Sequence, residues 1–125
     1  MKLSIQLFGG RGQSLGISKR LPNYSKTTIN DSKIYDYYLK NGSKHNSDFI
    51  DVGYTKNDGE LLKKHLLKGL ESNEAELSYK EETKYTSAVV YMKLGKTKKK
   101  RFKTIWGKNK GDKYFRNISA YRSDK

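Results

Sequence analysis

The sequence predicts an α+β fold in which two N-terminal helices pack on a C-terminal three-stranded antiparallel sheet. Two observations predict it. Strand-forming residues concentrate near the C-terminus, in three runs over Tyr85–Leu94, Lys100–Trp106 and Tyr114–Tyr121 that are separated by glycine-containing turns. Two segments with helical spacing of apolar residues come before these runs. Runs of helices followed by runs of strands are typical of the α+β class.

The first two expected strands alternate between apolar and polar residues, so each can bury one face. The other face of the sheet is expected to carry aromatic and cationic side chains. The apolar sides are Ala88, Val90, Met92 and Leu94 in one strand and Phe102, Thr104 and Trp106 in the next, and the opposite sides hold Tyr91, Lys93, Arg101 and Lys103.

The first helix is expected to start at Asn30 or Asp31 and to run through Lys40. The second is expected to start in a capping box at Asn57–Glu60. Its leucines should face the apolar side of the sheet, and the glutamate-rich segment 71–82 that follows is expected to face solvent or to screen the basic sheet. The leucines expected against Ala88, Val90 and Met92 are Leu62, Leu66 and Leu70.

The length of 125 residues predicts one domain over residues 31–125, preceded by a leader at 1–16 and a flexible arm at 17–30. The absence of cysteine excludes a disulfide framework, a thiolate nucleophile and a cysteine metal site. No apolar run approaches the roughly 20 residues of a membrane span, so we expect a soluble protein with no membrane partner. The acidic residues show no metal-ligand spacing and no glycine-rich phosphate loop precedes a helix, so we expect no metal and no cofactor.

The chain is strongly basic, with 27 Lys and Arg against 13 Asp and Glu and a net charge of +14. Residues 96–113 hold nine of these cations and one acid, Asp112. Such segregation favours a nucleic acid or an acidic protein as partner, the alternative being a charge that serves solubility alone. The expected nucleic-acid contacts are Lys96, Lys98, Lys99, Lys100, Arg101, Lys103, Lys108 and Lys110, with Tyr91 and Tyr114 as stacking residues.

The N-terminus reads Leu3-Ser-Ile-Gln-Leu-Phe8-Gly9. It resembles the leader of many head proteins of phages that infect Gram-positive bacteria, which also occurs on one bacterial large-subunit ribosomal protein. The resemblance implies cleavage between Phe8 and Gly9 by a host maturation protease, association with a phage head, and a location in the virion, the host cytoplasm or both. The alternative is an N-terminal strand with Leu3, Ile5 and Leu7 on one face.

Residues 31–122 are similar, in spaced residues such as Ala88-Val-Val-Tyr91 and Phe102-Lys-Thr-Ile-Trp106, to small toxin domains grouped with the barnase, EndoU, colicin and RelE ribonucleases. The resemblance implies metal-independent RNA cleavage, which needs a base, an acid and cations for the phosphorane. His45 is the candidate base by residue type, whereas His65 lies among leucines and is expected to belong to the helix packing. Candidates to hold a phosphate or a base are Thr104, Arg116 and Tyr121.

Three functions follow from these patterns. The first is a phage-encoded basic protein that binds nucleic acid, or a complex that contains it, through a cationic sheet. The second is a small metal-independent ribonuclease toxin that uses the same sheet. The third is an inhibitor of a host defence complex, and the sequence alone leaves open whether the chain is an enzyme.

Overall fold

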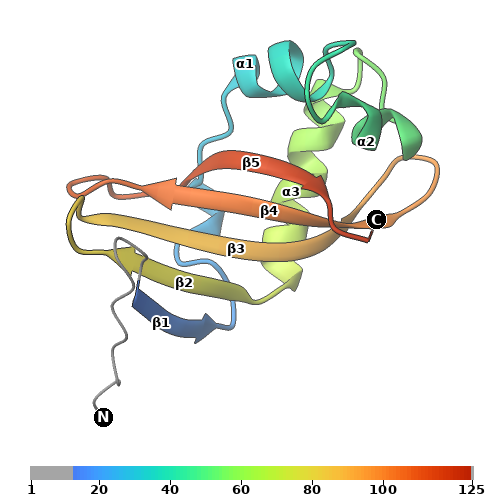
Figure 1. Cartoon of the computed structure of the whole chain (residues 1–125). Helices are drawn as coiled ribbons and strands as arrows, with labels where there is room; N and C mark the ends of the chain where they lie inside the picture. The colour runs from blue at the N-terminus through green and yellow to red at the C-terminus, as the bar shows by residue number, and fades with distance from the viewer. Residues whose placement is uncertain (1–12, 125) are drawn as a thin grey trace.

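The computed structural model describes residues 13–124, which form one five-stranded antiparallel sheet with helices on one of its sides (Figure 1). The strands lie in the order of the chain, each beside the next. Their bounds are β1 Gln13–Ser18, β2 Ala75–Lys80, β3 Tyr85–Leu94, β4 Lys100–Lys108 and β5 Arg116–Arg122.

Most of the helical structure lies between β1 and β2 in the chain. The longest helix, α3, crosses behind the sheet, and α1 and α2 lie on the side of β5 (Figure 1). The bounds are η1 Tyr24–Lys26, α1 Asp31–Lys33, the π-helical turn η2 Ile34–Tyr38, α2 Asn46–Asp51 and α3 Gly59–Ser72.

The core lies between α3 and the sheet. Leu62, Leu66 and Leu70 are fully buried, in one apolar cluster with Ala88, Val90 and Met92 of β3, which confirms the predicted burial of these two faces. The helix approaches β3 closely at Gly69, where a Cβ would overlap the sulfur of Met92. Phe49, Phe102 and Trp106 extend the cluster. The apolar face of α3 and the apolar face of the sheet are therefore both buried against each other.

The predicted architecture of two helices on a three-stranded sheet is wrong, because the sheet has five strands and the helical part has three α-helices. The two strands that were not predicted are β1 and β2, in which a glycine or charged residues obscure the alternation of apolar and polar residues. In the glutamate-rich segment, β2 alternates Ala75, Leu77 and Tyr79 with polar residues, and its pairing with β3 satisfies backbone groups that a three-stranded sheet would leave open at that edge.

The other added strand, β1, falls at the boundary of the expected leader and arm and pairs with β2 across a bulge between Ser14 and Gly16. The arm also contacts the domain further along the chain. Leu21 is buried in the core. The Thr28 N–H donates to the carbonyl of Phe115, just before β5, at 3.0 Å, and the Thr28 carbonyl accepts from the Asn117 N–H of β5 at 2.9 Å. Phe8 and Gly9, the expected processing site, and the alternative strand at Leu3–Leu7 lie outside the described residues.

The helical predictions also need correction in detail. The helix expected through Lys40 is one turn of α1 followed by η2, in which the Leu39 N–H donates to the Ile34 carbonyl five residues back. The capping box is absent, because the Asp58 carboxylate accepts from the N–H and hydroxyl of Thr55 instead of capping α3. Within residues 13–124 no helix is long and apolar enough to cross a membrane.

Candidate nucleic-acid interface

The face of the sheet opposite α3 carries an aromatic and cationic surface. Antiparallel pairing aligns Tyr91, Lys103 and Tyr121 in one row across β3, β4 and β5. The neighbouring row pairs Lys93 with Arg101. Directly opposed residues share a face, and we call these five residues the open face because no helix of the described chain covers them (Figure 1).

Arg101 lies over the ring of Tyr91, with its guanidinium carbon 4.1 Å from the ring centroid. This distance is typical of a cation–π contact, which keeps the guanidinium close to the ring. Arg101 and Lys93 are exposed, whereas Tyr91 and Lys103 are half-buried, so the cations stand at the surface with the aromatic ring beneath. The pair therefore presents both a positive charge and a planar surface to a ligand.

The cationic character stops one row further along the sheet. That row aligns Ile17, Glu76, Val89, Ile105 and Ser119, an apolar strip with one acid. Beyond this row the register places Lys80 opposite Tyr85 and Arg116 opposite Gly107, so the apolar strip separates these two cations from the open face beside the β3–β4 turn.

The β3–β4 turn, residues 95–99, is fixed in place. Lys96 and Thr97 each donate a backbone N–H to the Val52 carbonyl, at 2.8 and 3.0 Å, which ties the turn to the end of α2. Lys96 also pairs with Asp58 at 3.1 Å. Together with the Thr55 hydrogen bonds, which contribute most, Lys96 holds the pKa of the Asp58 carboxyl below its ordinary value.

The remaining residues of the expected contact set divide between the two ends of β4. Lys98 and Lys99 are exposed on the anchored turn and Lys100 opens β4. Lys108, Lys110 and Tyr114 lie at the opposite end, about 27 Å away along a nine-residue strand. Lys108 there sits over the Phe115 ring, 5.2 Å from its centroid. The structure thus places only part of the set on one surface.

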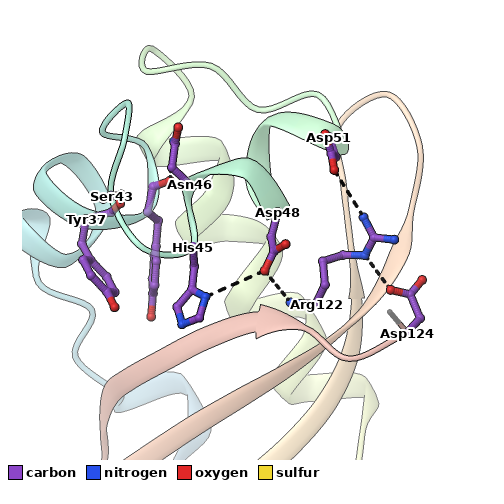
Figure 2. A network of polar contacts seen from close by, with 9 residues as sticks. Tyr37, Ser43, His45, Asn46, Asp48, Asp51, Arg122 and Asp124 are labelled. Carbon is purple, nitrogen blue, oxygen red and sulfur yellow. Dashed lines mark hydrogen bonds and ion pairs between the residues drawn. The ribbon is translucent and has the colours of Figure 1, made fainter.

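His45 and Tyr121, two of the four candidate catalytic residues, lie in contact. Their rings stack with centroids 5.0 Å apart at 28°. The edge of Tyr37 meets the same imidazole at 6.2 Å. Figure 2 shows His45 just before α2, facing β5, so this cluster borders the open face at Tyr121.

Asp48 lies one helical turn beyond His45, and its Oδ2 is 3.9 Å from the imidazole Nδ1 (Figure 2). The same oxygen accepts the backbone N–H of Arg122 at 3.0 Å, so it also covers the exposed edge of β5. The Arg122 guanidinium is held by Asp124 at 2.6 Å and by Asp51 at 4.0 Å. These carboxylates raise the pKa of the Arg122 guanidinium and neutralise much of its charge.

The other two candidates lie elsewhere. Thr104 is fully buried on the core face, where its hydroxyl donates to the Val90 carbonyl at 2.7 Å and accepts from the Trp106 indole at 2.8 Å. Arg116 begins β5, about 17 Å from Tyr121 along the strand, and pairs with Asp112 at 3.5 Å. Neither side chain reaches the His45 cluster.

His65 takes part in a polar chain that its leucine surroundings did not indicate. The Gly95 N–H donates to the Tyr54 hydroxyl at 3.0 Å, and that hydroxyl lies 2.6 Å from Nδ1 of His65. In the neutral imidazole Nδ1 can accept the Tyr54 proton, an arrangement that puts the imidazole hydrogen on Nε2. Burial, and then the charges of Lys99 and Lys64, lower the pKa of His65, which favours the neutral ring.

Sequence reasoning missed Asp48, Arg122 and the Tyr54–His65 pair. The spacing of His45 and Asp48 was a usable signal, because residues three apart meet on a helix, but residues 43–49 contain too few apolar residues to indicate one. Within the described part of the chain no group of three or more His, Asp or Glu side chains is placed to hold a metal ion.

The chain matches the family described as Domain of unknown function (DUF6883) over residues 20–124. The chain belongs to this family. The matched range covers the helices and the last four strands, and therefore includes the open face and the His45 cluster. No curated protein and no solved structure matches the chain.

Proposed function

We propose that this DUF6883 protein binds single-stranded nucleic acid on the open face of its sheet. The observation that carries the proposal is the aligned row of Tyr91, Lys103 and Tyr121, with Arg101 stacked on Tyr91. Cations beside aromatic rings on one surface suit a strand whose phosphates pair with the charges while its bases stack.

The chemistry of this surface favours nucleic acid over an acidic protein. A carboxylate-rich partner needs cations but makes no particular use of tyrosine and guanidinium planes, whereas every base has a π-face that stacks on them. An unpaired strand exposes these base faces and a duplex does not. The open face should therefore prefer single strands to duplexes of the same sequence.

Fluorescence anisotropy with labelled 12-nucleotide RNA, DNA and the corresponding duplexes tests the proposal at low salt. Single strands should bind more tightly than duplexes, and an acidic peptide of matched charge should compete only weakly. Equal affinity for strands, duplexes and the peptide would contradict base stacking and leave charge alone as the cause of binding.

A specific contact favours a second candidate function, metal-independent RNA cleavage at the border of the open face. His45 stacks on Tyr121 there and lies beside Asp48, which is placed to orient the imidazole or to balance its charge. An imidazole next to a strand-binding surface is the group that a 2′-hydroxyl needs as its base. The similarity to small ribonuclease toxin domains supports the same reading.

One assay on the same samples distinguishes the two candidate functions, binding and cleavage. Total RNA incubated with the protein in excess chelator is analysed for cleavage products and for mobility shift. A ribonuclease should lose cleavage in His45→Gln while still shifting the RNA. Intact RNA with a clear shift in the wild-type protein would leave binding alone.

We also propose a phage origin with processing after Phe8, on the similarity of residues 3–9 to phage head leaders. Four residues separate the Phe8–Gly9 bond from the first residue of β1. A protein delivered with phage DNA into a host would meet nucleic acids and nucleic-acid-bearing defence complexes, so inhibition of such a complex is compatible with the same surface. Intact mass of the protein after coexpression with the host protease tests the processing.

A further inference from the structure

A pocket of about 350 Å³ lies between the last turns of α3 and the edge of β3. It opens there because β2 pairs with β3 only as far as Val89, which leaves the following residues of β3 without a strand on that side. The side chains that line it come from α3, from the segment leading to β2, and from β3 and its turn. They include His65, Lys68, Ser72, Asn73, Lys93 and Lys99, and we call this site the lysine pocket.

The lysine pocket is cationic. Lys68, Lys93 and Lys99 line it, and none of the described residues that line it is acidic. Lys99 is partly fixed by a hydrogen bond from its Nζ to the Gly95 carbonyl at 3.3 Å. Lys68 lies 3.9 Å from Glu71, an exposed pair that is weak enough to yield to a better anion.

His65 adds a directed donor. His65 lines the pocket, and when its Nδ1 accepts from the Tyr54 hydroxyl the imidazole carries its hydrogen on Nε2 and can donate it to a ligand. The Tyr54 hydroxyl is itself held by the Gly95 N–H, which lies in the same turn as Lys99. The imidazole is therefore oriented before any ligand arrives.

The C-terminal end of α3 opposes an anion, because the last carbonyls of a helix carry partial negative charge. Two of these carbonyls are already capped. The Ser72 hydroxyl donates to the Lys68 carbonyl at 3.1 Å, and the Asn73 amide donates to the Gly69 carbonyl at 2.8 Å. The three lysines thus line a pocket beside a helix end where two of the last carbonyls already accept a side-chain hydrogen bond.

We propose that the lysine pocket binds the terminal phosphate of a nucleotide. A phosphate monoester carries nearly two charges and three acceptor oxygens, which suit a pocket lined by three lysines and one imidazole. The volume exceeds that of a phosphate alone and lies within the range of small-molecule sites, so part of the attached nucleoside fits as well.

Lys93 connects this pocket with the open face, because it lines the pocket and pairs with Arg101 across the sheet. The end of a bound strand can then place its terminal phosphate in the pocket while its bases lie on the open face. This extension to strands rests on the proposed function, whereas binding of a free nucleotide does not.

Calorimetry and NMR of the full chain test the pocket with three probes: adenosine 5′-monophosphate, inorganic phosphate and adenosine. The monophosphate should bind and shift the His65 ring signals, and adenosine should do neither. The double variant Lys68→Gln with Lys99→Gln should weaken binding of the monophosphate about tenfold or more. The control Lys26→Gln with Lys40→Gln, which removes two exposed lysines outside the pocket, should leave binding unchanged.

Equal weakening in the two double variants, or no binding of either phosphate probe, would overturn the proposal. Inorganic phosphate binding as tightly as the nucleotide would support the pocket and identify free phosphate as its ligand. Thermal unfolding of both variants checks that the fold is retained.

The strand extension is tested with 10-nucleotide strands that carry a terminal phosphate or a hydroxyl. The phosphorylated strand should bind more tightly, and the Lys68/Lys99 variant should lose this preference while it still binds the hydroxyl strand. Strands that bind without a preference, with no nucleotide binding, would refute the pocket and leave the open face intact. Nucleotide binding without any strand binding would support the lysine pocket and refute strand binding on the open face.

Discussion

Lys103 is the central residue of the open face, because it lies between two tyrosines in the same row. Tyr91 carries Arg101 on its ring, and Tyr121 carries His45. Each tyrosine thus has a flat, nitrogen-bearing group stacked on it before a ligand binds. A base that joins either stack gains contact without ordering a flexible side chain, which lowers the entropic cost of binding.

Removal of the Tyr91 ring tests this arrangement. Tyr91→Leu should weaken single-strand binding by about 1–3 kcal/mol, because one base loses its stacking partner and Arg101 loses its support. Tyr91→Phe keeps the ring and should bind within a factor of about two of the wild type. Anisotropy titrations measure both, and equal losses in the two variants would point to the hydroxyl instead of the ring.

His65 predicts a dependence of stability on pH. Its pKa is below the ordinary value of 6.5, first through burial and then through Lys99 and Lys64, while Lys68 and Lys93 line the same pocket and the Tyr54 hydroxyl is hydrogen-bonded to the ring. A lowered pKa means that the unfolded chain binds the proton more readily. The resulting stability is fully present above pH 6.5 and declines as the pH falls below that value.

Chemical denaturation of the wild type and of His65→Gln between pH 7.5 and pH 5 measures this effect. The free energy of unfolding should fall with pH more steeply in the wild type than in the variant. Identical pH profiles would show that protonation of His65 does not lower the free energy of unfolding.

At the scale of single residues, the sequence was informative where a reactive residue type occurs only once or twice in the chain. One of only two histidines, His45, was singled out by type and lies against Tyr121. The fully buried Thr104 shows the opposite case, because alternation placed it on the apolar face but could not show that its hydroxyl is used by Val90 and Trp106. Contacts that join distant segments, such as Asp48 with the Arg122 backbone, have no signal in a single sequence.

Among the elements, α3 was the best predicted because its leucines repeat with helical spacing over nearly three turns. The same spacing supports a stability prediction. Leu66→Ala should lower the free energy of unfolding by about 2–5 kcal/mol, because it leaves a cavity against β3. Lys64→Ala on the exposed side of the helix should change it by less than about 0.5 kcal/mol, and equal effects would mean that the buried face is assigned wrongly.

The strands β1 and β2 show why element prediction failed elsewhere. In β2 the alternating apolar residues are Ala75, Leu77 and Tyr79, but four glutamates in and around the strand resemble a solvated segment. In β1 a glycine and a bulge interrupt the alternation. β1 is stabilised by pairing with β2, more than fifty residues away in the sequence, and β2 pairs in addition with the adjacent β3. The periodicity within one segment does not reveal such pairing.

The position of β1 leads to a prediction for the N-terminus. Because the described part of β1 begins at Gln13, deletion of residues 1–8 keeps every strand pair within residues 13–124. The melting temperature of the truncated protein should stay within a few degrees of the full-length value. A deletion that extends through Ser18 removes β1 and exposes the edge of β2, so that variant should melt clearly lower. A large loss already in the shorter deletion would favour a structural role for the leader residues.

For the whole molecule, the net charge of +14 is unevenly arranged. The exposed cations of the open face and of the β3–β4 turn lie at one end of the sheet, next to the lysine pocket, and the row that follows is apolar with one acid. Composition predicted a polyanion as partner, but only the sheet register shows which cations share a surface. The account therefore predicts that the position of a lysine matters more than its contribution to net charge.

The salt dependence of single-strand binding in two charge-matched variants tests this claim most directly. Arg101→Gln with Lys103→Gln removes two charges from the open face, and Lys26→Gln with Lys40→Gln removes two elsewhere. The account predicts that the slope of log K against log salt becomes flatter by about 1.4 in the first variant, at about 0.7 per lost phosphate contact, and keeps the wild-type value in the second. Equal flattening in both variants, or no change in either, would contradict binding on the open face.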